Sequence, residues 1–485
     1  MMNPDTSEMV AVDATELLGL PRAEAGALVR RPSQPSALAR LRADPQRMTA
    51  VRDSWRALWS SRLLIWLAGF GAVLVLGLHW STTAFDPSNV TEGHGWLLDR
   101  LIAPFARWDS AWYLVIAKHG YGAAGGTLTS TRGAFFPLYP LVVGAIGQLG
   151  VPLVAAGILV SMGAFALALY GLHRLSTLEI TAPHRWSHPD VARMTVLVTA
   201  LSPVAFFLSA VYSESLYLAL SIGVFWCARK GRWATACVLG AFAAATRSAG
   251  VVLVLPIALL YLYGPRDDRA PDRPSSAIAG PPQSSWRRGL LALRPRYRLR
   301  ADSLWLALVP VGLAAFMGYL ALSGGDGMTP FHVQAVWDRQ FAGPFVAAWD
   351  GAVAAFDGAR QLLSLQLHHV YFPAAGGSPA IAAQHNITLF LFLLAAIPAL
   401  IAVLRALPFA YGAYLLAALA MPLSYPVSSQ PLMSLPRFLL VLFPLNIWLG
   451  SWLARHPRAR RPVFAAFGLL SVVFVAQFAT WHWVA

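Results

Sequence analysis

The sequence predicts an all-helical membrane protein that crosses the bilayer many times. The chain has 485 residues, of which 57% are hydrophobic and only 12% are charged. A soluble domain of this length carries about twice that share of charge. The apolar residues also occur in long blocks and not at the spacing of a single helix face, which is typical of segments that lipid surrounds.

The positive charge of the chain is typical of cytoplasmic loops. The formal net charge is +15, and arginine supplies nearly all of it, because Lys118 and Lys230 are the only lysines. Such basicity also suits a nucleic-acid partner, but the positive-inside rule accounts for it without one. We therefore expect a bilayer and no nucleic acid as the partner.

The first span is expected at Ser61–Trp80, where an apolar run starts on an Arg-rich side and ends in an interfacial tryptophan. The residues before it, 1–60, have no sustained periodicity. They are expected to form a disordered, Arg-rich cytoplasmic tail with one surface helix at most. No short apolar core with a cleavage site precedes the first span, so the span itself is expected to direct insertion.

Ten further spans can be placed by their basic ends, which gives eleven spans, a cytoplasmic N-terminus and an external C-terminus. They are expected at about 152–174, 193–210, 213–228, 233–247, 249–263, 303–322, 386–404, 408–423, 438–453 and 463–480. The apolar stretch Phe136–Gly150 is shorter, and counting it as a span would put the following Arg-rich loop outside. We expect it to be re-entrant or half-inserted.

A basic linker divides the chain into two membrane parts. Residues 264–302 hold nine arginines among Pro, Ser and Gly, which is typical of a flexible cytoplasmic loop. The linker separates an N-terminal part, 61–263, from a C-terminal part, 303–485. The two expected external loops, 81–135 and 323–385, are nearly charge-balanced and rich in aromatic and acidic residues, which favours a site on the external face.

The densest candidate site lies in the first external loop. FARWDSAWYLVIAKHGYG, Phe105–Gly122, is followed by AFFPLYP, Ala134–Pro140. Asp109 precedes an apolar run and is expected to cap a short helix at the membrane surface. A carboxylate fixed there could also accept a proton from an acceptor hydroxyl as a general base, and the two roles are compatible.

A second candidate lies inside the membrane. Glu214, in AVYSESLYLAL, is the one acidic residue within the expected spans, and it lies near an external end. Arg247, in ATRSAG, is a charge at comparable depth. Either the two residues form a buried ion pair between helices, or Arg247 binds the phosphate of a ligand.

The second half of the chain carries weaker candidates. In FHVQAVWDRQF, Phe331–Phe341, an amphipathic external helix that could anchor at the interface is expected to carry Gln334, Trp337, Asp338 and Arg339. Arg437, in SLPRFLL, stands at the external end of a span, against the charge rule. It either snorkels to the interface or binds an anionic ligand.

No metal or nucleotide cofactor is required by the pattern. His368, His369 and His385 have no acidic residue or cysteine at ligand spacing, so they are expected to be ordinary loop histidines. Asp109 with Glu214 could hold a divalent metal, although nothing in the spacing supports one. There is no phosphate-cradling Gly-rich loop, so a nucleotide-sugar donor is not expected.

The motifs RWDSAWYLVIAKHGY with FFPLYP, AVYSESLYLAL and ATRSAG occur in this order, with QAVWDR and SLPRF as weaker matches. Together they resemble the PIG-V family, the GPI mannosyltransferase 2 group, and particularly its bacterial homologues. The resemblance covers roughly residues 60–480. It implies a GT-C type glycosyltransferase of the plasma membrane that uses polyprenyl- or dolichyl-phosphate mannose at the external face.

On this resemblance Asp109 is the expected general base, and Arg247 with Arg437 would stabilise the departing lipid phosphate while the anomeric centre inverts. The expected donor- or acceptor-binding residues are Arg107, Trp108, Tyr113, His119, Tyr121, Phe136, Pro137, Tyr139, Tyr212, Glu214, Arg247, Gln334, Trp337 and Arg437. Trp112 stands where eukaryotic members are expected to have His. Because bacteria generally lack GPI, the resemblance implies the reaction and leaves the acceptor unknown.

Two other classes of protein would have a similar sequence. A transporter or lipid flippase also needs many spans, but the scarcity of intramembrane charge and the lack of an evident internal repeat oppose it. A non-enzymatic scaffold in a cell-envelope complex would tolerate replacement of Asp109 and Arg247.

Overall fold

The computed structural model describes residues 44–77, 90–91, 95–122, 130–181, 184–272, 294–323, 325–365 and 378–484. The chain forms two units, Met1–Thr49 and Ala50–Ala485. In the first unit, Asp44 Oδ1 accepts hydrogen bonds from the N–H groups of Gln46 and Arg47, which caps the start of a helix. The expected interfacial Trp80, the loop histidines His368 and His369, and much of the basic linker lie outside the described residues.

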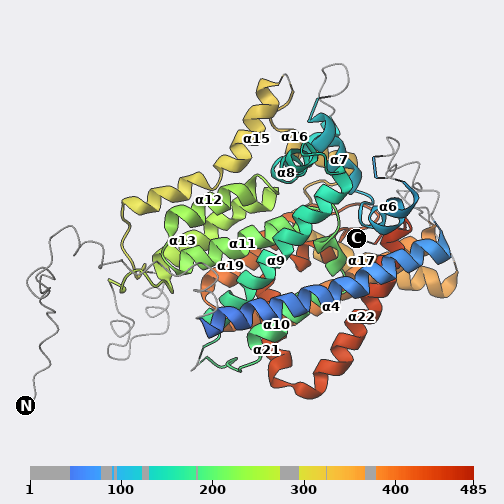
Figure 1. Cartoon of the computed structure of the whole chain (residues 1–485). Coiled ribbons are helices and arrows are strands. Elements are labelled where there is room, and N and C mark those ends of the chain that lie inside the picture. The colour runs from blue at the N-terminus through green and yellow to red at the C-terminus, as the bar shows by residue number, and fades with distance from the viewer. Residues whose placement is uncertain are drawn as a thin grey trace, which may run out of the picture. The chain divides into compact units, whose positions relative to one another are not determined.

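Every regular element of the described residues is a helix (Figure 1). The N-terminal part comprises α4 (Pro45–Leu76), α6 (Trp96–Leu101), η1 (Ala103–Phe105), α7 (Ser110–His119), η2 (Ser130–Ala134), α8 (Leu138–Gly147), α9 (Leu153–Glu179), α10 (Val191–Leu201), η3 (Ala205–Leu208), α11 (Glu214–Arg229), α12 (Trp233–Ala244), η4 (Ser248–Leu253) and α13 (Val254–Tyr263). The C-terminal part comprises η6 (Ala301–Leu308), α15 (Val311–Leu322), α16 (Thr329–His332), η7 (Val333–Trp337), α17 (Val346–Ser364), α18 (Pro379–Ala406), α19 (Phe409–Ser424), α20 (Leu435–Leu440), α21 (Phe443–Arg455) and α22 (Pro457–Ala479).

Helix length and composition indicate a multi-span membrane protein. Within the described residues, four helices are long and apolar enough to cross a bilayer, namely α4, α9, α18 and α22. The pair η6 and α15, bent by 41°, would make a fifth span. Shorter apolar helices accompany them: α8, α10, α12, η4 with α13, and α19. The stretch expected to be half-inserted contains α8, whose 10 residues are too few for a crossing.

The first long helix starts earlier than its apolar run indicates. α4 begins at Pro45 and not at Ser61, so the tail boundary expected at residue 60 falls inside a helix. The reason is that the stretch before Ser61 also packs against the protein, since Asp53 is buried with its Oδ2 3.4 Å from His173 Nε2 on α9. Burial of polar side chains continues along the helix. Arg62 is fully buried, and its guanidinium donates to the carbonyl oxygens of Ala200 and Ala205 and to Ser209 Oγ, each at 2.9 Å. Hydropathy alone does not reveal a helical segment whose polar side chains are buried and hydrogen-bonded in this way.

Three expected spans are interrupted next to prolines. The 193–210 stretch breaks after α10 at Pro203, the 303–322 stretch bends at Pro310, and the 438–453 stretch divides between α20 and α21 just before Pro444. Proline cannot donate a backbone hydrogen bond, and its ring blocks the preceding turn. The interruptions place several short helices at the end of the bundle that holds Glu214.

The helices pack in a few close pairs. α11 lies beside α9 and α12, α10 lies beside α21, and α17 lies beside α18 (Figure 1). Close approach requires small residues at the contacts. At Gly450 on α21, an added Cβ would lie 2.4 Å from Thr195 Oγ1 on α10. That contact has no room for any larger side chain.

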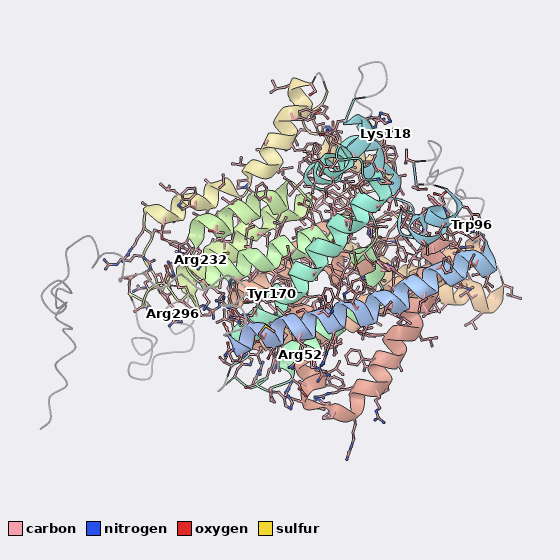
Figure 2. All side chains as sticks on the ribbon, viewed as in Figure 1. Arg52, Trp96, Lys118, Tyr170, Arg232 and Arg296 are labelled. Atoms are coloured by element: carbon pink, nitrogen blue, oxygen red, sulfur yellow. The ribbon has the colours of Figure 1, made fainter. Side chains whose placement is uncertain are left out.

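The two ends of α11 differ in charge. Glu214 lies at its first residue, and Arg229 at its last forms ion pairs with Glu179 and with Asp267, the latter at 3.6 Å. A helix of 16 residues is about 24 Å long, so the two charges are well separated. In the view of Figure 2, Arg232 and Arg296 both lie on the side of the structure away from Lys118 on α7 and from Trp96. We call the end that holds Arg229, Arg232 and Arg296 the basic end.

Gly450→Val should destabilise the fold by about 1–3 kcal/mol, because its side chain would force α10 and α21 apart. The matched control is Gly163→Val on α9, where no atom lies within 4 Å of an added Cβ. The measurement is the thermal unfolding midpoint of each purified variant in detergent. Equal midpoints for the two variants would contradict the packing described here.

Candidate functional site

Backbone hydrogen bonds bring the sequence motifs together at one place. The N–H of Val211 donates to the carbonyl of Phe105 at 2.9 Å, and the N–H of Leu138 donates to the carbonyl of Ala245 at 3.0 Å. The first bond joins the AVYSES motif to the RWD loop, and the second joins FFPLYP to ATRSAG. Segments more than a hundred residues apart in the sequence therefore form one site.

Four charged side chains form the centre of this site, and we call them the acid–arginine cluster: Asp109, Glu214, Arg247 and Arg437. Arg437 Nη1 donates to Asp109 Oδ2 at 2.7 Å, while its Nε and Nη2 reach Glu214 Oε1 at 3.0 and 2.9 Å. Arg247 Nη1 lies 2.8 Å from the same Glu214 oxygen. Arg437 therefore bridges the two carboxylates, as the fork of a guanidinium allows.

Exposure differs sharply within the cluster. The side chain of Glu214 is 0% exposed, Arg437 is 8% and Arg247 is 16%, whereas Asp109 is 25% exposed. Asp109 Oδ2 is held by Arg437, and no described group donates to Oδ1. Asp109 is thus the carboxylate that a ligand can reach, while Glu214 is buried and holds both arginines in place.

The backbone before Asp109 aims its side chain at Arg437. Asp109 occupies the N-cap position of α7, but its side chain caps no N–H, so the expected capping role is wrong. Its carboxylate is instead drawn to the guanidinium. Trp108 has a left-handed backbone with φ of 57°, which is rare for a bulky residue and costs about 1–3 kcal/mol. Packing of its ring against Trp481 and Trp483 offsets that strain.

Arg107 and Trp108 position the site and do not line it. Arg107 is 1% exposed, its Nε donates to the carbonyl of Ala479 at 3.1 Å, and its guanidinium lies over the ring of Trp481. Both side chains are packed against residues 479–483. They fix the loop that ends in Asp109. The sequence pattern instead predicts that these two side chains contact a ligand.

Several predicted site residues form the wall behind the cluster. Tyr113 hydrogen-bonds to Ser213 Oγ at 2.9 Å, and Tyr212 donates to the carbonyl of Arg107 at 3.1 Å while its ring lies under Arg437. Tyr121, Phe136, Pro137 and Tyr139 lie further back. Tyr121 donates to the carbonyl of Phe135, Tyr139 donates to Gly157, Phe136 packs on Phe316, and Pro137 starts α8.

Three predicted residues do not reach the cluster. His119 is exposed at the end of α7. Gln334 donates to the carbonyl of Pro330 at 3.3 Å, and the ring of Trp337 packs on Phe135. The single amphipathic helix expected around them is wrong, because α16 and η7 have only 4 and 5 residues, and η7 ends at Asp338 with φ of 54°.

The ion-pair alternative for Glu214 and Arg247 is confirmed, and Arg437 does not snorkel, because it is buried between two carboxylates. Both arginines therefore neutralise protein carboxylates. Arg437 also fills the space between Asp109 and Glu214 where a metal ion had been considered. In the part of the chain that the structure describes, no three His, Cys, Asp or Glu side chains form a metal-binding group.

The sequence reasoning missed other buried charges. Asp53 on α4 and Glu179 on α9 are buried acids that pair with His173 and Arg229. His385, expected in a loop, lies inside α18. Arg339, expected with Trp337 on an amphipathic helix, instead contacts the backbone carbonyls of Tyr425 and Met433.

These observations define a multi-span helical membrane protein with a partly buried acid–arginine site at one end of its helices. Residues 82–262 match the family model described as Mannosyltransferase (PIG-V). GPI alpha-1,6-mannosyltransferase 2 of Homo sapiens is 33% identical over 168 residues, which cover 33% of this chain and 32% of the relative. The protein of the same name from Rattus norvegicus is 33% identical over 170 residues, again 33% and 32% of the two chains.

Residues 82–262 are thus similar to the PIG-V mannosyltransferase family. The match spans about a third of the length of these relatives. The segment matched by the family model contains Asp109, Glu214 and Arg247, whereas Arg339 and Arg437 lie beyond it. The cluster is thus completed by a residue from the unmatched C-terminal part.

Arg437→Gln should destabilise the protein by about 3–5 kcal/mol, because it leaves the buried Glu214 and the half-buried Asp109 short of a counter-charge. The exposed Arg455 at the end of α21 provides the matched control, Arg455→Gln. Unfolding midpoints in detergent measure both. In the double variant with Glu214→Gln, the two losses should be less than additive. Strict additivity would show that the two residues do not interact.

Proposed function

We propose that the protein is a membrane mannosyltransferase that moves a mannose from a lipid-phosphate donor to an acceptor hydroxyl, with Asp109 as the general base. The observation that carries this proposal is the placement of Asp109, a reachable carboxylate whose position is fixed by a buried arginine. The similarity of residues 82–262 to the PIG-V mannosyltransferase model supports the sugar. The relatives' names specify an α-1,6 linkage for those proteins, and we extend to this chain only the transfer of mannose.

The proposed chemistry is a single displacement at the anomeric carbon. Asp109 takes the proton of the acceptor hydroxyl, whose oxygen forms a bond to the anomeric carbon. The bond from that carbon to the phosphate oxygen breaks, and the lipid phosphate leaves with the electron pair. Attack opposite to the leaving phosphate inverts the centre. A base that is fixed within reach of the hydroxyl accelerates such a step by about 10²–10⁴-fold.

We propose that the acid–arginine cluster faces the external side of the plasma membrane. The basic end of the helices would then be cytoplasmic, in accordance with the positive-inside rule. In this arrangement the short apolar helices complete a GT-C type bundle of about eleven spans with a cytoplasmic N-terminus. The polyprenyl-phosphate donor would approach Asp109 along the outer leaflet.

The first test is transfer of labelled mannose from synthetic polyprenyl-phosphate mannose by membranes that contain the protein. Asp109→Asn should lower the transfer rate by at least about 100-fold, because an amide cannot take the proton. Asp357→Asn, an exposed position on α17, is the matched control and should behave like the wild type. Near-normal transfer by Asp109→Asn would refute the base role. Movement of lipid across liposomes without transfer would favour a flippase instead.

The proposed orientation can be tested by labelling introduced cysteines with a membrane-impermeant maleimide in intact cells. Lys118→Cys, at the exposed end of α7, should be labelled directly. Arg458→Cys, exposed near the start of α22, should be labelled only after the membrane is permeabilised. The two natural cysteines are buried and supply the background. The reverse labelling pattern would place the site on the cytoplasmic side.

A further inference from the structure

We propose that Arg339 is the residue that binds the phosphate group of the ligand in the Asp109 site. This inference rests on the proposed function and deepens it. It replaces the expectation that Arg247 and Arg437 would serve as the phosphate ligands, since both are engaged by Glu214 and Asp109.

Arg339 is held near the acid–arginine cluster by contacts with the segment that precedes α20. Its Nη2 donates to the carbonyl of Met433 at 3.0 Å, and its Nη1 lies 3.4 Å from the carbonyl of Tyr425. Met433 directly precedes the turn into α20, the short helix that carries Arg437. An antiparallel bridge between Arg339 and Val427 fixes the backbone as well.

The segment around Arg339 also packs on Phe135, which in turn stacks on the helix that follows Asp109. The ring of Trp337 lies 6.1 Å from that of Phe135, which stacks on Trp112 of α7. Asp338 Oδ2 accepts a hydrogen bond from the N–H of Ser428 at 3.1 Å. The direct contact with Met433 and the indirect one through Phe135 thus place Arg339 near the two elements that supply Arg437 and Asp109.

Among the residues that the structure describes, no carboxylate neutralises Arg339 by an ion pair. Within the acid–arginine cluster, by contrast, two carboxylates face two guanidiniums. Burial and the nearby positive charge of Arg437 lower the pKa of Arg339 to about 10, and Asp109 acts against this shift. The hydrogen bonds of Arg339 hold its positive charge near that of Arg437. An anion bound to Arg339 would reduce the repulsion between the two guanidiniums.

The geometry of the guanidinium suits a phosphate. The two carbonyl contacts occupy two of its five N–H donors, so a planar edge remains for oxygen ligands. Phosphate oxygens accept such paired hydrogen bonds, and a guanidinium fork binds them more specifically than an ammonium does. The ligand class is therefore a phosphate group, and in the proposed reaction the lipid phosphate is the leaving group.

The test measures binding of polyprenyl phosphate, which carries no sugar, to the full-length protein in nanodiscs. Arg339→Gln should weaken binding by about 10- to 100-fold, the range expected when a charged hydrogen bond is lost. Neutral polyprenol should bind the wild type and this variant alike. Arg360→Gln, exposed on α17, is the matched control and should leave affinity unchanged.

A second variant separates ligand binding from loop placement. Asp338→Ala removes the hydrogen bond to Ser428 but keeps the guanidinium, so it should bind polyprenyl phosphate nearly as well as the wild type. An equal loss in Asp338→Ala and Arg339→Gln would overturn the proposal, because loosening of the loop would then explain both. Displacement by inorganic phosphate would support the anion site and identify free phosphate as its ligand.

Failure of this inference can be distinguished from failure of the proposed function. If Arg339→Gln binds polyprenyl phosphate as the wild type does while Asp109→Asn abolishes mannose transfer, only the role of Arg339 is wrong. If the wild type binds no polyprenyl phosphate, the lipid-phosphate donor and the role of Arg339 are both wrong.

Discussion

The bridge that Arg437 makes between Asp109 and Glu214 is the interaction on which the candidate site depends. Asp109 comes from the start of α7, Glu214 from the start of α11, and Arg437 from α20 near the other end of the chain. Two carboxylates this close would repel each other without a cation between them. A guanidinium can satisfy both at once, because its donors point in two directions. A lysine at this position could not hold both carboxylates in the same way.

The site combines a rigid, buried part with an accessible part. Glu214 is fully buried and holds Arg437 and Arg247, which makes it a positioning residue. Asp109 is the reachable carboxylate, and Arg339 adds a positive charge that no described carboxylate balances. A sugar bound to a phosphate would match this arrangement, with the anionic group on Arg339 and the reacting carbon near Asp109. The strained backbone of Trp108 is part of the same arrangement. It directs the side chain of Asp109 away from the N-terminus of α7 and toward Arg437.

The amino-acid sequence predicted the helical membrane architecture, because long apolar blocks are a strong signal. It gave the ion pair of Glu214 with Arg247 as one of two alternatives, the other being a phosphate ligand on Arg247. It could not predict the breaks at Pro203, Pro310 and Pro444 from span-length patterns alone. Nor could it show that Arg437 meets Asp109, since that contact joins residues 328 positions apart. Arg107 and Trp108 were predicted as ligand-binding residues because motif position does not distinguish a side chain that lines a site from one that supports it.

The most direct test of the account is a cryo-electron microscopy structure of the protein in a nanodisc with a non-hydrolysable phosphonate analogue of polyprenyl-phosphate mannose. We expect mannose beside Asp109, the phosphonate in contact with Arg339, and the Arg437 bridge to Asp109 and Glu214 still in place. A sugar bound elsewhere, for example at the basic end of the helices, with no ligand contact to Asp109, would contradict it.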